Sequence, residues 1–186
     1  MIIGITGTNG SGKGEVANYL VDKKGFNHYS TRALIIQEIQ KRGLPVNRDT
    51  MNTVSTDMRK TLGGEVFHKI LYERAVRDGG DAVIESVREV PGADFLKKHG
   101  AFLIAVDANQ RERYDRSKKR GSSTDYIEFD TFKMQEEREM QDPDPLKQNV
   151  RKVMEMADAF IENNGTMGEL HRKVDEALEK FIKPGE

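Results

Sequence analysis

A glycine-rich segment that directly follows a short apolar run places the strongest constraint on this chain. Residues 2–6 predict a buried strand, residues 7–14 read Gly-Thr-Asn-Gly-Ser-Gly-Lys-Gly, and an amphipathic segment begins at Lys13. The pattern GxxxxGK between a strand and a helix predicts a phosphate-binding loop, because its glycines let successive N–H groups turn inward while the lysine adds a positive charge. The alternatives are a glycine-rich turn without a ligand and a dinucleotide-binding fingerprint, which has no lysine at this position.

Two positions of this segment differ from the usual phosphate loop. Gly14 stands where serine or threonine commonly offers a hydroxyl to Mg²⁺, so the metal would be held in another way. Glu15 falls in the first turn of the predicted helix, where a carboxylate favours the helix dipole but would repel phosphates if it faced them. The residues predicted to hold ATP at this segment are Gly7, Asn9, Gly10, Ser11, Gly12, Lys13, Gly14 and Glu15.

Short apolar runs alternate with longer amphipathic segments along the whole chain. The runs predicted to be strands are 2–6, 26–29, 82–85, 102–107 and 159–162. The segments predicted to be helices are 13–23, 31–42, 49–62, 65–78, 90–99, 109–120, 127–141, 146–156 and 167–182. This alternation is typical of an α/β fold in which helices cover both faces of a parallel sheet. The length of 186 residues fits a single domain, 1–186.

The charge balance and the residue types exclude several functions. The chain has 30 basic and 31 acidic residues, which removes the simplest electrostatic argument for nucleic acid or membrane partners. It has no cysteine, so a disulfide framework and a thiolate nucleophile are excluded. No apolar stretch approaches the ~20 residues that span a bilayer, and the N-terminus does not read as a secretory signal. We expect a soluble cytoplasmic protein with small-molecule substrates; its oligomeric state is left open.

The stretch from His28 to Ile36 resembles the motif His-x-Ser-Thr-Gly-Asp-x-Leu-Arg of the adenylate kinase and nucleoside monophosphate kinase group, in which a glycine also follows the loop lysine. Ser30 and Thr31 match, whereas Ile36 replaces the arginine that grips the acceptor phosphate. One of Arg32, Arg48 and Arg59 could supply that charge. Structurally, Ser30 or Thr31 is also a helix N-cap. The residues that the resemblance assigns to the acceptor are Ser30, Thr31, Arg32, Arg59 and Arg88.

The segment after the third predicted strand, Glu85-Ser86-Val87-Arg88, is similar to that group's Asp-Gly-x-Pro-Arg. Ligands bind at the carboxyl edge of a parallel sheet, so Glu85 could orient Mg²⁺-bound water or accept a proton. Arg88 would hold an acceptor phosphate. An ordinary exposed ion pair between the two is the alternative.

Residues 111–120 contain six basic and two acidic side chains and resemble the lid of these kinases, whose arginines close over the transferring phosphate. Arg113, Arg116 and Arg120 can share a helical face, and the resemblance assigns Arg113 to ATP. A solvated basic face or a nucleic-acid patch is the alternative. The acidic run at 136, 137 and 139 predicts a solvated helix face that could pair with this segment.

The C-terminal turn Asn164-Gly165 looks like a motif of dephospho-coenzyme A kinases that lies beside adenine, although it also makes sense as a tight turn. The four histidines, at 28, 68, 99 and 171, show no metal-ligand spacing and are predicted to be surface or packing residues.

Together these resemblances imply a three-layer P-loop NTPase fold with a five-stranded parallel sheet of order 2-3-1-4-5 and a helical lid. They place an acceptor arm near 30–78 and the lid near 111–145. The implied reaction transfers phosphate from ATP, with Mg²⁺, to a ribo- or deoxyribonucleoside monophosphate. The alternatives are a dephospho-coenzyme A kinase and a nucleotide-gated binding module without catalysis. The residues assigned to catalysis are Lys13, Glu85, Arg88, Arg116 and Arg120, with Glu85 also assigned to the metal through water.

Overall fold

Five strands form one sheet in the computed structural model, which describes residues 1–120, 127–144 and 146–182 but not the side chain of Arg48. The strands are β1 (Ile2–Gly7), β2 (Asn27–Ser30), β3 (Ala82–Glu85), β4 (Phe102–Asp107) and β5 (Ala159–Glu162). Their order is β2-β3-β1-β4-β5, and every neighbouring pair is parallel. The predicted fold class and strand order are therefore confirmed.

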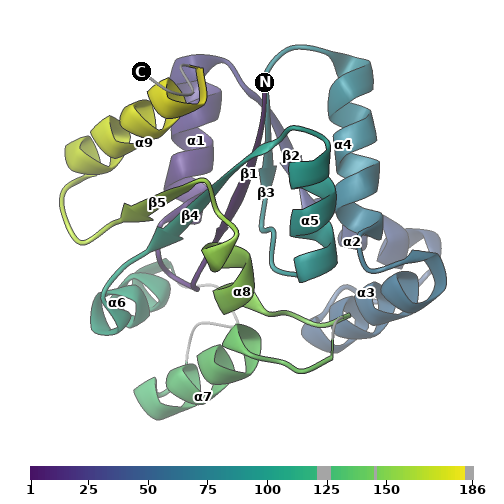
Figure 1. The fold of residues 1–186 in the computed structure, drawn as a ribbon. Coiled ribbons are helices and arrows are strands. Elements are labelled where there is room, and N and C mark those ends of the chain that lie inside the picture. The colour runs from purple at the N-terminus through teal and green to yellow at the C-terminus, as the bar shows by residue number, and fades with distance from the viewer. Residues whose placement is uncertain (121–126, 145, 183–186) are drawn as a thin grey trace.

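Helices connect the strands and cover both faces of the sheet. They are α1 (Lys13–Lys24), α2 (Thr31–Lys41), α3 (Arg48–Leu62), α4 (Val66–Asp78), α5 (Val90–Lys98), α6 (Gln110–Arg120), α7 (Phe129–Met140), α8 (Val150–Glu155) and α9 (Met167–Ile182). Figure 1 shows α1 and α9 on one face and α4, α5 and α8 on the other. The result is a three-layer α/β/α arrangement.

Two apolar cores lie on opposite sides of the sheet. Ile104 packs in the core that includes α1 and α9, whereas the adjacent Leu103 packs in the core that includes α4 and α5. Successive side chains of a strand point to opposite faces, so a strand covered on both sides needs a continuous apolar run. This requirement explains why the short apolar runs predicted the strands correctly.

One predicted helix begins later than expected. The pattern predicts a helix from residue 146, but α8 begins at Val150. The side chain of Asn149 accepts a hydrogen bond from the Lys152 amide at 3.2 Å, and the Asn149 amide donates to the Arg88 carbonyl oxygen at 3.0 Å. The N-cap and this tertiary contact therefore set the start of α8. All the other predicted ends agree with the structure within two residues.

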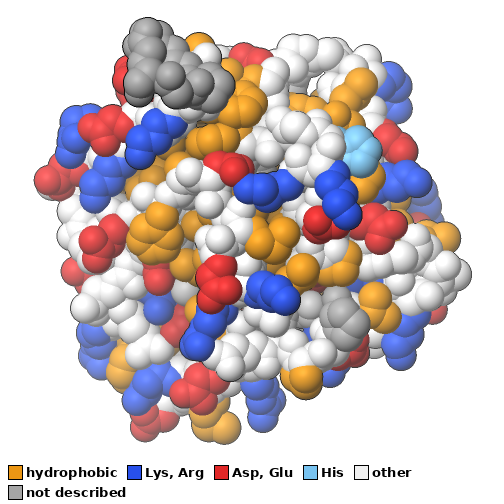
Figure 2. Space-filling model, viewed as in Figure 1, with side chains coloured by type: hydrophobic (Ala, Val, Ile, Leu, Met, Phe, Trp, Pro, Cys, Tyr) orange, Lys and Arg blue, Asp and Glu red, His pale blue; other side chains and the backbone are white. Residues whose placement is uncertain are grey.

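The carboxyl ends of the parallel strands bring the end of β1 close to the ends of β3 and β4. This edge is where ligands bind in open α/β sheets. Part of the predicted lid, residues 121–126 and 145, lies outside the described residues. On the face in Figure 2, basic side chains are interspersed with acidic ones. Over the described part of the chain, no helix has the length and apolar character needed to span a membrane.

Candidate functional site

The loop between β1 and α1 closes around the carbonyl oxygen of Thr8. That oxygen accepts hydrogen bonds from the Ser11 hydroxyl at 2.9 Å and from the Lys13 ammonium at 2.5 Å. Gly12 precedes α1 with a φ angle of 101°, a conformation that favours glycine. The first N–H groups of a helix have no partner within the helix and bind anions readily. The predicted phosphate-binding loop therefore has the geometry that its pattern implies.

Lys13 is the main charge of this loop and is only 7% exposed. Burial, and then the nearby positive charge of Arg88, lower the pKa of Lys13 from 10.5 to about 7. The carboxylates of Glu85 and Glu139 act in the opposite direction, and the charge of Arg120 lowers the pKa further. An anion in the loop would favour the charged lysine again. Lys13 therefore releases its proton near neutral pH in the free loop, and a bound phosphate would stabilise its charged form.

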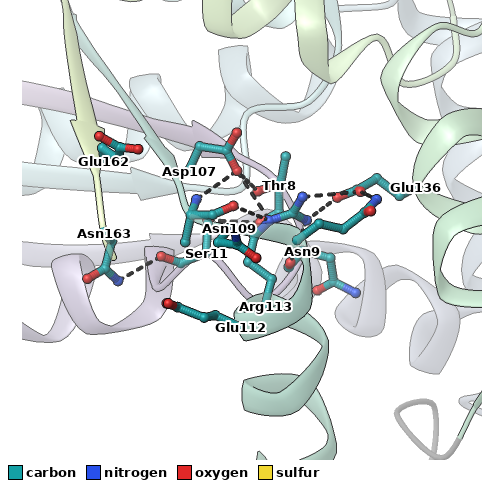
Figure 3. Close-up of polar contacts among 12 residues, drawn as sticks. Thr8, Asn9, Ser11, Asp107, Asn109, Glu112, Arg113, Glu136, Glu162 and Asn163 are labelled. Carbon is teal, nitrogen blue, oxygen red and sulfur yellow. Dashed lines mark hydrogen bonds and ion pairs between the residues drawn. The ribbon is translucent and has the colours of Figure 1, made fainter. Parts of the chain in front are cut away.

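Two side chains from distant segments support this loop from outside, as Figure 3 shows. Asp107, at the end of β4, accepts a hydrogen bond of 2.5 Å from the Thr8 hydroxyl. Asn163, which follows β5, donates a hydrogen bond of 2.8 Å to the Ser11 carbonyl oxygen. The loop is thus tied to the two strands on one side of β1, and these contacts fix its conformation before a ligand arrives.

Neither Asp107 nor Asn163 is among the site residues predicted from the sequence. Asp107 ends a predicted strand, as Glu85 does, so the rule that selected Glu85 also selects Asp107. Asn163 precedes the predicted Asn164-Gly165 turn and carries no local signal of its contact with Ser11, which lies 152 residues away in the chain.

We predict that Asp107→Ala weakens ADP binding about tenfold, because the Thr8 hydroxyl would lose its charged partner and the loop its anchor. Isothermal titration calorimetry with ADP measures this change. Asp115→Ala is the matched control, since Asp115 is exposed on α6 and its ion pair, with Arg111 at 3.7 Å, lies on the same helix. Equal affinities of the two variants would contradict a supporting role for Asp107.

Arg113 of α6 packs against the backbone of the loop. Its guanidinium is almost fully buried and donates to the carbonyl oxygens of Asn9, at 3.3 Å, and Ala108, at 2.8 Å. Both of its terminal nitrogens also bond to Glu136 of α7 (Figure 3). In this conformation Arg113 supports the loop through Asn9, and its contact with ATP remains a prediction.

The segment after β3 faces the same loop. Ser86 adopts a φ angle of 69°, which is uncommon for a residue with a side chain and marks a sharp turn. The charges of Glu85 and Arg88, on either side of this turn, both act on Lys13. Arg88 also donates hydrogen bonds to Glu139, at 3.0 Å, and to Gln148, at 3.2 Å. The structure therefore brings the predicted residues Lys13, Glu85 and Arg88 together at one edge of the sheet.

Glu85 has a partner that the sequence did not reveal. Its carboxylate lies 3.0 Å from the Nε2 atom of His28 on β2. This hydrogen bond, and the charges of His28, Lys13 and Arg88, hold the pKa of Glu85 below its usual value although burial opposes the shift. Glu85 is therefore ionised at neutral pH, and His28, predicted as a surface or packing residue, lies partly exposed beside the site.

The predicted acceptor residues have separate positions. Ser30 is the N-cap of α2 and accepts a hydrogen bond from the Ala33 amide at 3.3 Å. Thr31 is buried and donates to the Glu85 carbonyl oxygen at 3.3 Å. Arg32 is exposed in the first turn of α2. The N-cap interpretation therefore holds for Ser30, and Thr31 joins α2 to the end of β3.

Arg59 is buried in the last turn of α3 and forms an ion pair with Glu89, the residue after Arg88. Its guanidinium also lies 5.2 Å from the centroid of the Phe67 ring. In this conformation Arg59 joins α3 to the segment that carries Arg88. The side chain of Arg48, the other arginine of α3 considered for the acceptor, lies outside the described residues.

The remaining predicted residues lie on α6, in the turn after β5 and in the first turn of α1. Arg116 donates to the carbonyl oxygen of Asn163 at 2.9 Å, and Asn164 accepts from the Asn109 amide at 2.7 Å. These contacts join α6 to the turn after β5, which includes the exposed Gly165. Gly14 and Glu15 are exposed in the first turn of α1.

The residues at the loop are compatible with magnesium bound mainly through nucleotide phosphates. Mg²⁺ usually keeps several waters and binds one or two carboxylates together with substrate phosphates. Glu85 supplies an ionised carboxylate close enough to act electrostatically on Lys13. In the described part of the chain, no group of three or more His, Asp or Glu side chains could hold a metal by itself. The donor set thus fits a metal that arrives with the nucleotide.

The sheet order and the loop after β1 define the class of fold as a P-loop kinase fold. Shikimate kinase from Aquifex aeolicus has a similar structure, with a TM-score of 0.59, 17% identity and 100% of both chains covered. A gluconokinase from Sinorhizobium meliloti is similar with a TM-score of 0.52 and 16% identity over 96% of this chain and 91% of that chain. At these identities the likeness concerns the fold.

The AAA_18 family model, described as an AAA domain, matches residues 3–144. The UPF0200 protein TK1334 of Thermococcus kodakarensis is 30% identical over 191 residues, covering 98% of each chain. The chain therefore belongs to the AAA_18 family of AAA domains and to the UPF0200 family.

Proposed function

We propose that this protein transfers the terminal phosphoryl group of ATP to a small phosphorylated acceptor, with a nucleoside monophosphate as the preferred class. The observation that carries this proposal is the arrangement of Lys13, Arg88 and Glu85. The charges of an arginine and an ionised carboxylate at the carboxyl edge of the sheet act on the buried lysine of the phosphate loop. A phosphate loop alone would account for nucleotide binding, whereas the second set of charges supports an acceptor next to the donor.

Each group has a defined task in this reaction. The loop amides and Lys13 hold the donor phosphates, and Arg88 holds the phosphate of the acceptor. Phosphoryl transfer has a loose transition state with charge spread over the equatorial oxygens, so positively charged groups placed in advance stabilise it. Arg116 and Arg120 on α6 are the proposed source of further positive charge, because the charge of Arg120 already acts on Lys13. Mg²⁺, when bound with ATP, neutralises charge on the phosphates.

A second candidate is transfer to a hydroxyl, as in dephospho-coenzyme A kinases. The pair of Glu85 and His28 favours it, because a hydroxyl loses a proton when it attacks and an ionised carboxylate can accept that proton. A nucleoside monophosphate attacks through a phosphate oxygen and has less need of such a group. The reading as a non-catalytic, nucleotide-gated module is the third possibility.

A panel of acceptors distinguishes these functions. The purified protein is incubated with Mg²⁺-ATP and, in separate reactions, with ribo- and deoxyribonucleoside monophosphates, dephospho-coenzyme A, shikimate and gluconate, and ADP is followed. We expect one or more nucleoside monophosphates to stimulate ADP formation. Stimulation only by dephospho-coenzyme A would favour the second candidate. ATP binding without stimulation by any acceptor would favour the binding module and contradict a kinase.

A further inference from the structure

The helix α7 presents two carboxylates to arginines that border the phosphate loop. Glu136 and Glu139 are three residues apart and therefore lie on the same face of the helix. Glu136 binds both terminal nitrogens of Arg113, and Glu139 binds Arg88 at 3.0 Å. Glu137, between them, is exposed. The arrangement therefore selects two glutamates of the acidic run and leaves the third in solvent.

Glu139 lies where an anion is expected. Its carboxylate binds Arg88, the proposed ligand of the acceptor phosphate, and its charge also acts on the loop lysine, Lys13. The side chains of Arg88 and Glu139 are 22% and 29% exposed, so the pair is partly shielded from solvent. A carboxylate and a phosphate present similar oxygen acceptors to a guanidinium. An ion pair of this kind competes directly with a substrate phosphate for Arg88.

Few buried apolar side chains hold α7 against the rest of the protein. Phe132 is the one side chain of this helix that is fully buried among the described residues, where its ring lies 5.6 Å from that of Tyr114. Elements with few buried apolar side chains open at low free energy. The contacts of Glu136 and Glu139 therefore contribute a substantial part of the free energy that holds α7 against the site.

We propose that Glu139 is an internal substitute for a substrate phosphate, and that α7 closes the subsite between Lys13 and Arg88 until a phosphoryl group displaces it. This inference rests on the proposed function, since it assigns the subsite to a phosphate of the substrates. The free protein divides between a closed form, with Glu139 on Arg88, and a form in which Arg88 is available. The apparent affinity for an anion is reduced by the fraction of the available form.

Binding of inorganic tripolyphosphate and of ADP tests this proposal by calorimetry. Tripolyphosphate can extend from the loop toward Arg88, whereas the two phosphates of ADP occupy the loop. We expect Glu139→Gln to bind tripolyphosphate about tenfold more tightly than the wild-type protein, with a smaller change in ADP affinity because ADP does not require Arg88. Glu137→Gln is the matched control, because it removes the same charge from the same helix at an exposed position.

A double variant separates competition for Arg88 from a general charge effect. In the Arg88→Met background, Glu139→Gln should give no gain in tripolyphosphate affinity, because Glu139 can compete with a phosphate only where Arg88 is present. A gain that persists in this background, or an equal gain in Glu137→Gln, would overturn the inference. If ADP binds the wild-type protein while Glu139→Gln has no effect, the inference alone fails. If neither ADP nor tripolyphosphate binds, the proposed function fails with it.

Discussion

Replacement of Lys13 by methionine is expected to abolish phosphoryl transfer and, at the same time, to make the free protein more stable. Transfer should fall by at least about 10²-fold, because the loop loses the charge that stabilises the phosphates. The stability gain follows from the pKa of Lys13, which burial lowers from 10.5 to about 7. Each pKa unit corresponds to about 1.4 kcal/mol, so a charged lysine in the free loop costs on the order of a few kcal/mol. Methionine fills similar space without this cost, and Tm should rise by roughly 5 °C or more.

The pH dependence of this gain has a definite sign. Between about pH 7 and pH 10.5 the unfolded chain binds more protons at Lys13 than the folded protein does, so the destabilising contribution of Lys13 to the wild-type protein declines as pH rises. The advantage of Lys13→Met should therefore be complete below about pH 7 and decline as pH approaches 10.5. Thermal unfolding across this range measures it, with the exposed Lys69→Met as control. A variant that is less stable than the wild-type protein at every pH, or one with near-normal transfer, would contradict the role of Lys13.

The fold could be predicted from the chain to a large extent because its signals are local. Buried strands of a parallel sheet require apolar runs on both faces, and the runs at 82–85 and 102–107 coincide with β3 and β4. The strand order could not be predicted from local signals, because no local pattern determines which strands are neighbours. It was predicted from the resemblance to kinases. The start of α8 was wrong because the bond from the Asn149 amide to the Arg88 carbonyl oxygen joins segments 61 residues apart.

Local sequence signals also predicted part of the candidate site, whereas its contacts between distant segments could not be predicted. The loop residues form a contiguous motif, and Glu85 ends a strand, so both were accessible to sequence reasoning. The partners of these groups come from distant segments: His28 pairs with Glu85 57 residues away, and the Thr8 hydroxyl bonds to Asp107 99 residues away. The sequence also allowed the acidic run to pair with the basic segment, and Glu136 does so through Arg113. The ion pair between Glu139 and Arg88 depends on how α7 packs against the site, and the periodicity of apolar residues in the sequence does not specify that packing.

Gly7→Ala is expected to be severely destabilising, whereas Gly14→Ala should be neutral or slightly stabilising. Gly7 has a φ angle of 135°, and a Cβ atom there would lie 1.9 Å from the carbonyl oxygen of Val106 on the neighbouring strand. The backbone of β4 cannot yield without breaking its ladder with β1, and an L-residue at this φ is strained in any case. We expect a loss of at least about 3 kcal/mol, which corresponds to a fall in Tm of roughly 10 °C.

Gly14 provides the matched comparison because it belongs to the same loop motif. It lies in the first turn of α1, and a Cβ atom there would meet no atom within 4 Å. Alanine is favoured over glycine in a helix by up to about 1 kcal/mol, so the Tm of Gly14→Ala should be unchanged or higher. Thermal unfolding followed by far-UV circular dichroism compares the two variants directly. The conformation of the phosphate loop depends on its close approach to β4. If Gly7→Ala unfolded at the same temperature as Gly14→Ala, this close approach would be refuted.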